Sequence, residues 1–177
     1  MIASLVKKPT QPKIPITPGP VEKILDLLGL VVVILLWIYT LMTYDQLPDQ
    51  VVVHLNFEGH ADRLGHKTQL YFLPGLVTFL YAGLVWLNRY PHLFNYLVEI
   101  TPENAARQYQ LGTRFMRFIN LSILTLFAGI HLEFIEMSGM DPSAPVENQG
   151  LLIMVGVHIL ITFIGVIFYL VKSSNAK

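Results

Sequence analysis

The chain has 177 residues, with twelve basic and twelve acidic side chains, so its formal net charge is zero. Charged residues make up 14% of the chain, whereas an ordinary soluble domain carries about 25%. The neutral balance argues against a nucleic-acid-binding protein. The lack of cysteine excludes a disulfide framework, a zinc ribbon and thiol catalysis.

Hydrophobic residues are concentrated in four runs, which predict an all-α integral membrane protein. The charge-free runs cover residues 27–44, 70–87, 118–132 and 151–171. Apolar segments of this length satisfy their backbone hydrogen bonds in lipid by forming helices. We therefore expect an antiparallel bundle of four transmembrane helices, over about 24–44, 70–88, 116–137 and 150–171. These spans form one membrane domain, 24–177, which follows a Pro- and Lys-rich tail, 1–23.

The basic residues of the connections predict the orientation in the membrane. Ten of the twelve lie in the N-terminal tail, the 89–117 region and the C-terminal tail, whereas only Arg63 and Lys67 lie in the other two connections. The positive-inside rule predicts that both termini and the 89–115 loop lie on the cytoplasmic side of a bacterial inner membrane. The loop 45–69 is then expected on the outer surface.

The cytoplasmic loop contains a pattern that is typical of a helix start. Thr101-Pro102-Glu103 reads as an N-cap, a proline in the first turn and an early acidic residue. It predicts a short amphipathic helix that runs from Pro102 towards the third span. Arg107, Arg114 and Arg117 fall on one face of this helix, where we expect them to contact lipid phosphates. Docking of a cytoplasmic partner is the alternative.

The loop 45–69 carries the most specific pattern in the chain. Gln50–Phe57 predicts one short strand, and Glu58-Gly59 predicts a turn. Nine positions form a spaced motif: Leu47, Pro48, Val51, His54, Asn56, Gly59, Asp62, Gly65 and Lys67. In this motif, and in most of the chain from Ile24 onwards, the protein resembles an uncharacterised bacterial membrane domain. That domain also forms the N-terminal part of SdpI-type immunity and signalling proteins.

The resemblance implies a fold and a loop more than an activity. Val51-Val52 stands where that family often has Ile-Pro, and Ala61-Asp62 stands where it has Pro-Asp. The longer SdpI-type proteins also continue with further spans, whereas this chain has four candidate spans. Immunity or signalling against a membrane-active toxin is therefore a function that the resemblance implies and the residues alone do not.

The polar motif residues allow two interpretations. In the functional one, His54, Asn56, Asp62 and Lys67 form a small site for a peptide, a lipid head group or a cation. In the structural one, Asn56 and Asp62 fasten the loop through bonds to the backbone, His54 caps a helix end and Lys67 anchors at the membrane interface.

A metal site is not favoured, although three histidines of the loop recur every six residues. These are His54, His60 and His66. The even spacing puts them on one face only while the chain stays extended, and Gly59 is expected to turn it. We expect neither a metal nor another cofactor.

Two histidines are predicted within the membrane, at similar depth in the third and fourth spans. They are His131 and His158, and Glu133 and Glu136 lie nearer the water. If the two histidines face each other, they form either part of a proton or cation path or a neutral interhelical hydrogen bond.

The chain lacks a Ser/His/Asp set and a Gly-rich phosphate loop, so we do not expect an enzyme. The leading hypothesis is an accessory or sensing protein that binds a protein or peptide partner through the loop 45–69, surrounded by lipid. Immunity or signalling is the second hypothesis, and a small cation or proton transporter is the third. A homo-oligomer and a subunit of a larger membrane complex both stay open.

Overall fold

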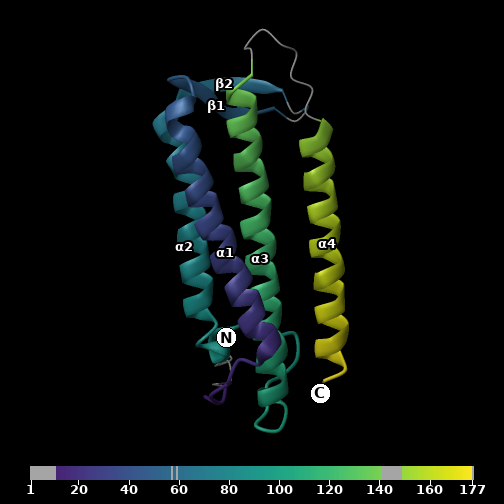
Figure 1. Ribbon diagram of the computed structural model, residues 1–177. Helices are drawn as coiled ribbons and strands as arrows, with labels where there is room; N and C mark the ends of the chain where they lie inside the picture. The colour runs from purple at the N-terminus through teal and green to yellow at the C-terminus, as the bar shows by residue number, and fades with distance from the viewer. Residues whose placement is uncertain (1–10, 57, 59, 141–148, 177) are drawn as a thin grey trace, which may run out of the picture.

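The computed structural model describes residues 11–56, 58, 60–140 and 149–176. Four long helices dominate: α1 (Pro20–Thr43), α2 (Phe72–Leu87), α3 (Ala105–Ser138) and α4 (Gln149–Ser174). All four are long and apolar enough to cross a membrane, the second together with the short helix before it. The predicted antiparallel bundle of four transmembrane helices is thus confirmed (Figure 1).

A small β-hairpin covers one end of the bundle. It consists of β1 (Gln50–Leu55) and β2 (Ala61–His66), which pair antiparallel. The 3-10 helices η1 (Tyr44–Gln46) and η2 (Lys67–Tyr71) join it to α1 and α2, and a third, η3 (Pro91–Leu93), follows α2. Both described chain ends lie at the opposite end (Figure 1). We call the two ends the hairpin end and the termini end.

Helix α3 is the central element of the bundle. It packs against α1, α2 and α4, and its last turns also contact β1. Val33 and Leu36 of α1, Val77 of α2 and Leu124 of α3 form the buried core. By contrast, only 6% of the most apolar stretch of α4 is buried within the chain, so most of the surface of this helix faces outward.

The start of α3 differs from the prediction. Residues 89–138 are all described and contain no separate amphipathic helix, because one continuous helix of 34 residues runs from Ala105 through the third span. Asn104 is the N-cap, and its Oδ1 accepts a bond from the Thr101 backbone N–H, so residues 101–104 form a turn instead of the first helical residues. At 1.5 Å per residue, a helix of this length exceeds a hydrocarbon layer of about 30 Å and extends beyond it.

The hairpin also differs from the single predicted strand. One strand was predicted over Gln50–Phe57. The structure has a strand over Gln50–Leu55, and Ala61–His66 pairs with it as a second strand. The register shifts at Val53, which packs on the apolar cluster below the sheet. Glu58 lies in the turn, as predicted, whereas Gly59 falls outside the described residues.

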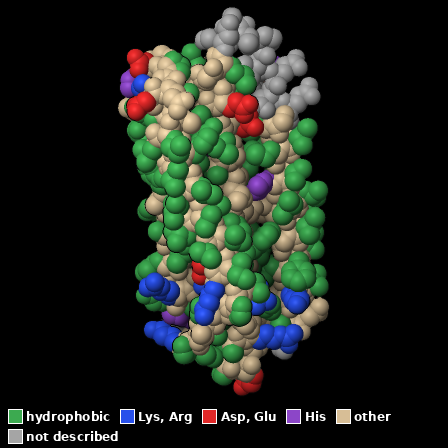
Figure 2. All heavy atoms as spheres, in the orientation of Figure 1, with side chains coloured by type: hydrophobic (Ala, Val, Ile, Leu, Met, Phe, Trp, Pro, Cys, Tyr) green, Lys and Arg blue, Asp and Glu red, His purple; other side chains and the backbone are tan. Residues whose placement is uncertain are grey.

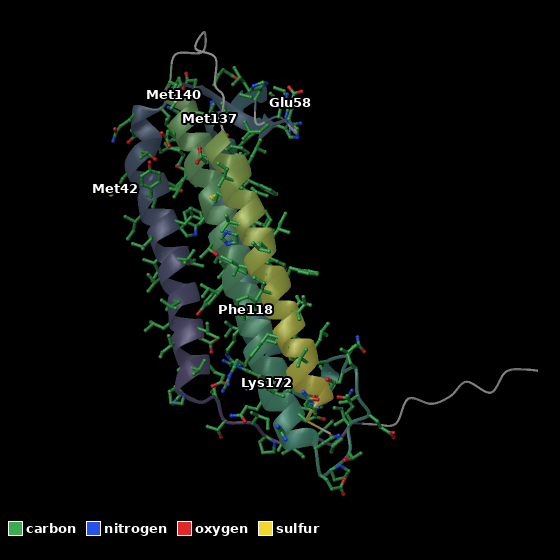
Figure 3. The ribbon with its side chains drawn as sticks, turned by 90° about the vertical axis from the view of Figure 1, so that its right-hand side faces the viewer. Met42, Glu58, Phe118, Met137, Met140 and Lys172 are labelled. Carbon is green, nitrogen blue, oxygen red and sulfur yellow. The ribbon has the colours of Figure 1, made fainter. Side chains whose placement is uncertain are left out.

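Charged side chains are divided between the two ends. Figure 2 shows hydrophobic side chains along the length of the bundle and Lys and Arg gathered towards the termini end of this face. Figure 3 places Glu58 at the hairpin end and Lys172 at the termini end. On this face, basic side chains therefore gather at the end of the bundle that holds both described chain ends.

Candidate functional site

The hairpin is fixed to the helices by an apolar cluster and a hydrogen bond. Val51 of β1, Leu70 of η2 and Ile135 of α3 are buried together, and Leu47 packs against them. The backbone N–H of Val52 donates to Ser138 Oγ at 2.8 Å. The edge of β1 is therefore held by α3, and the hairpin is positioned by the bundle. Sequence reasoning missed Ser138, because nothing local marks a serine as the partner of a distant strand.

The base of the hairpin is held by Lys67. Its Nζ lies 3.3 Å from Asp49 Oδ1 and 3.5 Å from the Leu47 carbonyl oxygen, and 5.1 Å from the centre of the Tyr44 ring. The side chain is 20% exposed, so most of it is sheltered. Lys67 thus connects the end of α1 to the start of η2, while the neighbouring Pro48 is exposed.

The tip of the hairpin is organised by Asn56. Its Oδ1 accepts hydrogen bonds from the backbone N–H groups of Glu58 and His60, both at 2.9 Å. Its own backbone N–H donates to the His60 carbonyl oxygen, also at 2.9 Å. The predicted fastening of the loop by Asn56 through the backbone is thus present, and it closes the turn between the two strands.

His54 and Asp62 form an exposed pair across the two strands. His54 Nδ1 and Asp62 Oδ1 are 2.6 Å apart, and the side chains are 54% and 43% exposed. The prediction that His54 caps a helix end is wrong, because His54 bonds to Asp62. His66 takes the capping role instead, since its side chain accepts from the Thr68 N–H at the start of η2. Asp62 was expected to bond to the backbone, but its carboxylate bonds to the His54 side chain.

The three loop histidines have three different partners. His54 pairs with Asp62, His60 lies 3.5 Å from Glu58, and His66 bonds to Thr68. Within the described ranges there is no group of three or more His, Asp or Glu side chains that could hold a metal ion.

Part of the hairpin surface is exposed and mainly polar. We call the exposed side chains of His54, Asp62 and Leu64 the hairpin face. Leu64 is 55% exposed. A hydrogen-bonded polar pair and an exposed leucine therefore occur within a few residues on a hairpin that is fixed to the bundle. Sequence reasoning missed Leu64 as a member of this surface.

The two intramembrane histidines do not face each other, so the predicted pair is wrong. His131 Nε2 lies 2.8 Å from Thr40 Oγ1 on α1. His158 Nε2, on α4, lies 2.9 Å from Thr125 Oγ1 on α3. Each histidine therefore joins a different pair of helices. Of the two acidic residues near them, Glu136 is exposed and Glu133 is half-buried.

The predicted lipid-facing arginines are also corrected. Arg117 Nε lies 2.9 Å from both carboxylate oxygens of Asp26, and Arg117 is only 8% exposed. Arg114 Nε lies 2.7 Å from Glu22 Oε1, and Glu22 is 1% exposed. Both arginines face α1 because its two acidic residues lie one turn apart towards α3. Of the three, only Arg107 is exposed.

Comparisons with known proteins identify relatives of this chain by their sequences. Residues 31–78 match the family described as a domain of unknown function, DUF1648. This segment contains the second half of α1, the whole hairpin and the first turns of α2. An uncharacterised protein of Archaeoglobus fulgidus is 31% identical over 128 residues, which cover 64% of this chain and 70% of that protein. No solved structure matches the chain. The chain belongs to the same family as this archaeal protein and contains the DUF1648 region at its hairpin end.

Proposed function

We propose that this protein is a small, non-enzymatic membrane protein that recognises a protein or peptide partner through its hairpin face. The observation that carries the proposal is the braced hairpin, which presents exposed polar groups from a fixed position at one end of a transmembrane bundle. Ten of the twelve basic residues lie in the two tails of the sequence and in the 89–117 region, so the proposal puts the termini in the cytoplasm and the hairpin on the outer surface of a cytoplasmic membrane.

The bracing supports recognition because a rigid surface loses little entropy on binding. Val51 and Val52 of β1 are both buried, and Val51 packs against Leu70 and Ile135, so β1 is fixed to the bundle. Asn56 closes the tip, and Lys67 holds the base. A loop that served only to connect two helices would need neither the pairing of β1 with β2 nor the hydrogen bonds of Asn56. Preorganisation of this kind raises affinity by reducing the cost of ordering.

Strand β2 supplies a surface for an extended partner. Residues 61–64 of β2 are exposed, and β1 occupies only one edge of this strand. The other edge of a strand presents backbone N–H and C=O groups that can pair with an added strand. The side chains of His54 and Asp62 then offer polar groups that select the partner. An extended segment of a protein or a peptide fits this surface better than a small ion does.

The experiment compares the proteins that co-purify with four tagged versions of the chain from native membranes in mild detergent. They are the wild type, His54→Ala, Asp62→Ala and a control, Glu99→Ala, whose exposed side chain lies at the termini end. We expect a stoichiometric companion with the wild type and Glu99→Ala and at least tenfold less with the two hairpin variants, all four being inserted in equal amounts. Equal recovery of the companion with both hairpin variants would refute the proposal.

Two other functions stay predictions. Immunity or signalling against a membrane-active toxin is implied by the resemblance to SdpI-type proteins, and it requires that deletion sensitises cells to such a toxin. Transport of a proton or cation through His131, Glu133, Glu136 and His158 is less well supported, because the histidines join different helix pairs. It requires that the protein dissipates an ion gradient in liposomes. Association through the exposed surface of α4 is compatible with all three functions.

A further inference from the structure

A cavity of about 400 Å³ lies beneath the hairpin, where β1, η2, α2 and α3 meet. Its walls are mainly apolar and include Val53 of β1, Leu70 of η2, Leu73 of α2 and Phe134 of α3. The volume lies at the lower end of the range that small-molecule sites occupy. Three of the lining residues are polar, and their chemistry indicates what the cavity can bind.

The first polar residue is His131, and its hydrogen bond to Thr40 determines which ring nitrogen remains available. The Thr40 hydroxyl donates its single hydrogen to the Leu36 carbonyl oxygen at 2.7 Å. Thr40 Oγ1 must therefore accept the bond that joins it to His131 Nε2 at 2.8 Å, so the proton of the neutral imidazole is on Nε2. The other nitrogen, Nδ1, is then an acceptor.

This acceptor has no partner among the described residues. His131 is fully buried, and Nδ1 is one of the buried side-chain atoms that make no hydrogen bond within the described chain. A buried polar atom without a partner is costly, and such atoms are uncommon in folded proteins. Because His131 lines the cavity and its Nε2 is occupied by α1, a molecule in the cavity with a hydroxyl group can complete the pairing of Nδ1.

The second and third polar residues are Arg63 of β2 and Gln69 of η2. No carboxylate oxygen of the described residues lies within 4.0 Å of the Arg63 guanidinium, whereas the arginines at positions 114 and 117 are both paired. Arg63 therefore remains able to bind an acidic group, and guanidinium groups bind carboxylates and phosphates in a bidentate manner. The cavity thus combines apolar walls, a buried acceptor and a guanidinium group that has no carboxylate partner among the described residues.

We propose that this cavity binds a small amphipathic molecule with an apolar, preferably aromatic, body. Its hydroxyl group donates a hydrogen bond to His131 Nδ1, and its acidic group binds Arg63. The apolar body lies between the side chains of β1, α2 and α3. The site is separate in kind from the recognition of a protein by the hairpin face, and it stands whether or not such a partner exists.

The test uses a matched pair of probes with the purified protein in detergent micelles. The first is 4-(4-hydroxyphenyl)butanoate, and the second is its methyl ether, which has the same body and acidic group but no donor. Isothermal titration against the protein, with empty micelles as the blank, measures both affinities. We expect saturable binding of the hydroxyl compound with one site per chain, and binding of the ether at least about tenfold weaker. Equal affinities, or no heat beyond that of the micelles, would overturn the proposal.

Variants then test the contacts of Arg63 and His131 with the probe. Arg63→Gln removes the cation and should weaken binding of the hydroxyl probe about tenfold. Arg89→Gln, at the termini end, should leave the affinity for this probe unchanged. His131→Phe should make the two probes bind equally. If His131→Phe does not fold, Leu73→Trp replaces it, because the larger side chain fills the cavity from α2 and should abolish binding of both probes. Unchanged binding in Leu73→Trp would place the probe elsewhere and overturn the assignment.

Discussion

The ion pair between Arg117 and Asp26 allows the packing of α3 against α1 to be tested quantitatively. Arg117 Nε bonds to both carboxylate oxygens of Asp26 at 2.9 Å, and its Nη1 donates to the Thr113 carbonyl oxygen at 3.2 Å. The side chains of Arg117 and Asp26 are 9% and 27% exposed. Arg117→Met removes the cation and leaves the Asp26 carboxylate without its partner.

The expected cost follows from the burial of the pair. Removing one partner of a fully buried ion pair costs about 3–5 kcal/mol, and since part of Asp26 is exposed, we expect about 2–4 kcal/mol. For a chain of this size, that loss lowers the melting temperature by roughly 4–16 °C. The double variant Asp26→Leu/Arg117→Met should regain most of the loss, because it leaves no unpaired charge. The bond from the Tyr81 hydroxyl to the Asp26 backbone carbonyl does not depend on the carboxylate.

The assay is thermal unfolding in a mild detergent, followed by the fluorescence of the two tryptophans. Arg107→Met is the matched control, because it removes an exposed arginine from the same helix, and it should change the free energy of unfolding by less than about 0.5 kcal/mol. If Arg117→Met lowers the melting temperature no more than Arg107→Met does, the ion pair makes no net contribution and Arg117 behaves as a lipid-facing residue.

Three further predictions concern single contacts, each measured by the same thermal unfolding assay unless stated. Gly165→Ala should destabilise the protein by about 1–3 kcal/mol, because the new methyl group meets the Phe118 ring across the α3–α4 contact. Gly156→Ala is the control, because open space surrounds Gly156 and the stability should not change. Equal melting temperatures of the two variants would contradict this packing. Thr40→Val should lower the free energy of unfolding by about 1–3 kcal/mol, because it deprives the buried His131 Nε2–H of its acceptor. Thr40→Ser keeps the hydroxyl and should retain most of the stability. A valine variant as stable as the wild type would show that this bond contributes nothing. Asn56→Ala should open the tip of the hairpin, so that limited proteolysis cleaves between residues 56 and 62 faster than in the wild type. Asn56→Asp keeps the acceptor oxygen and should be cleaved at about the wild-type rate. Cleavage of Asn56→Ala at the wild-type rate would argue against a role of Asn56 in closing the turn.

The four spans could be predicted from the sequence because their signal is local and strong. Long runs without charge leave a helix as the structure that satisfies the backbone in lipid. The even number of crossings followed from the division of basic residues. The start of α3 was predicted three residues too early because Thr101-Pro102 is typical of a helix start, yet Asn104 bonds to the Thr101 N–H and the helix begins at Ala105.

The hairpin could be predicted only in part. The β-branched residues of β1 indicated a strand, but Ala61–His66 contains none, and it is extended because β1 pairs with it. Asn56 was assigned correctly because its bonds reach only two and four residues along the chain. The partners of His54, eight residues away, and of Val52, 86 residues away, depend on the fold.

The intramembrane polar residues were the least predictable. Depth in the membrane follows from position along a helix, so His131 and His158 were correctly expected within their spans. The face that each helix turns to its neighbours depends on the packing of the whole bundle. His131 therefore meets Thr40 of α1, and Arg117 meets Asp26 instead of lipid. A useful signal was available, since α1 carries acids at 22 and 26 and α3 carries arginines at 114 and 117, with matching helical spacing.

Recognition through the hairpin face is tested most directly by site-specific photo-crosslinking in intact native membranes. A benzophenone side chain replaces Leu64, which is 55% exposed on β2, and the control replaces Leu97, which is 71% exposed at the termini end. We predict one discrete crosslinked protein or peptide from position 64 that is absent from position 97 and is lost when Asp62→Ala is added. If position 64 yields only uncrosslinked protein or the same products as position 97, the hairpin face does not bind a partner.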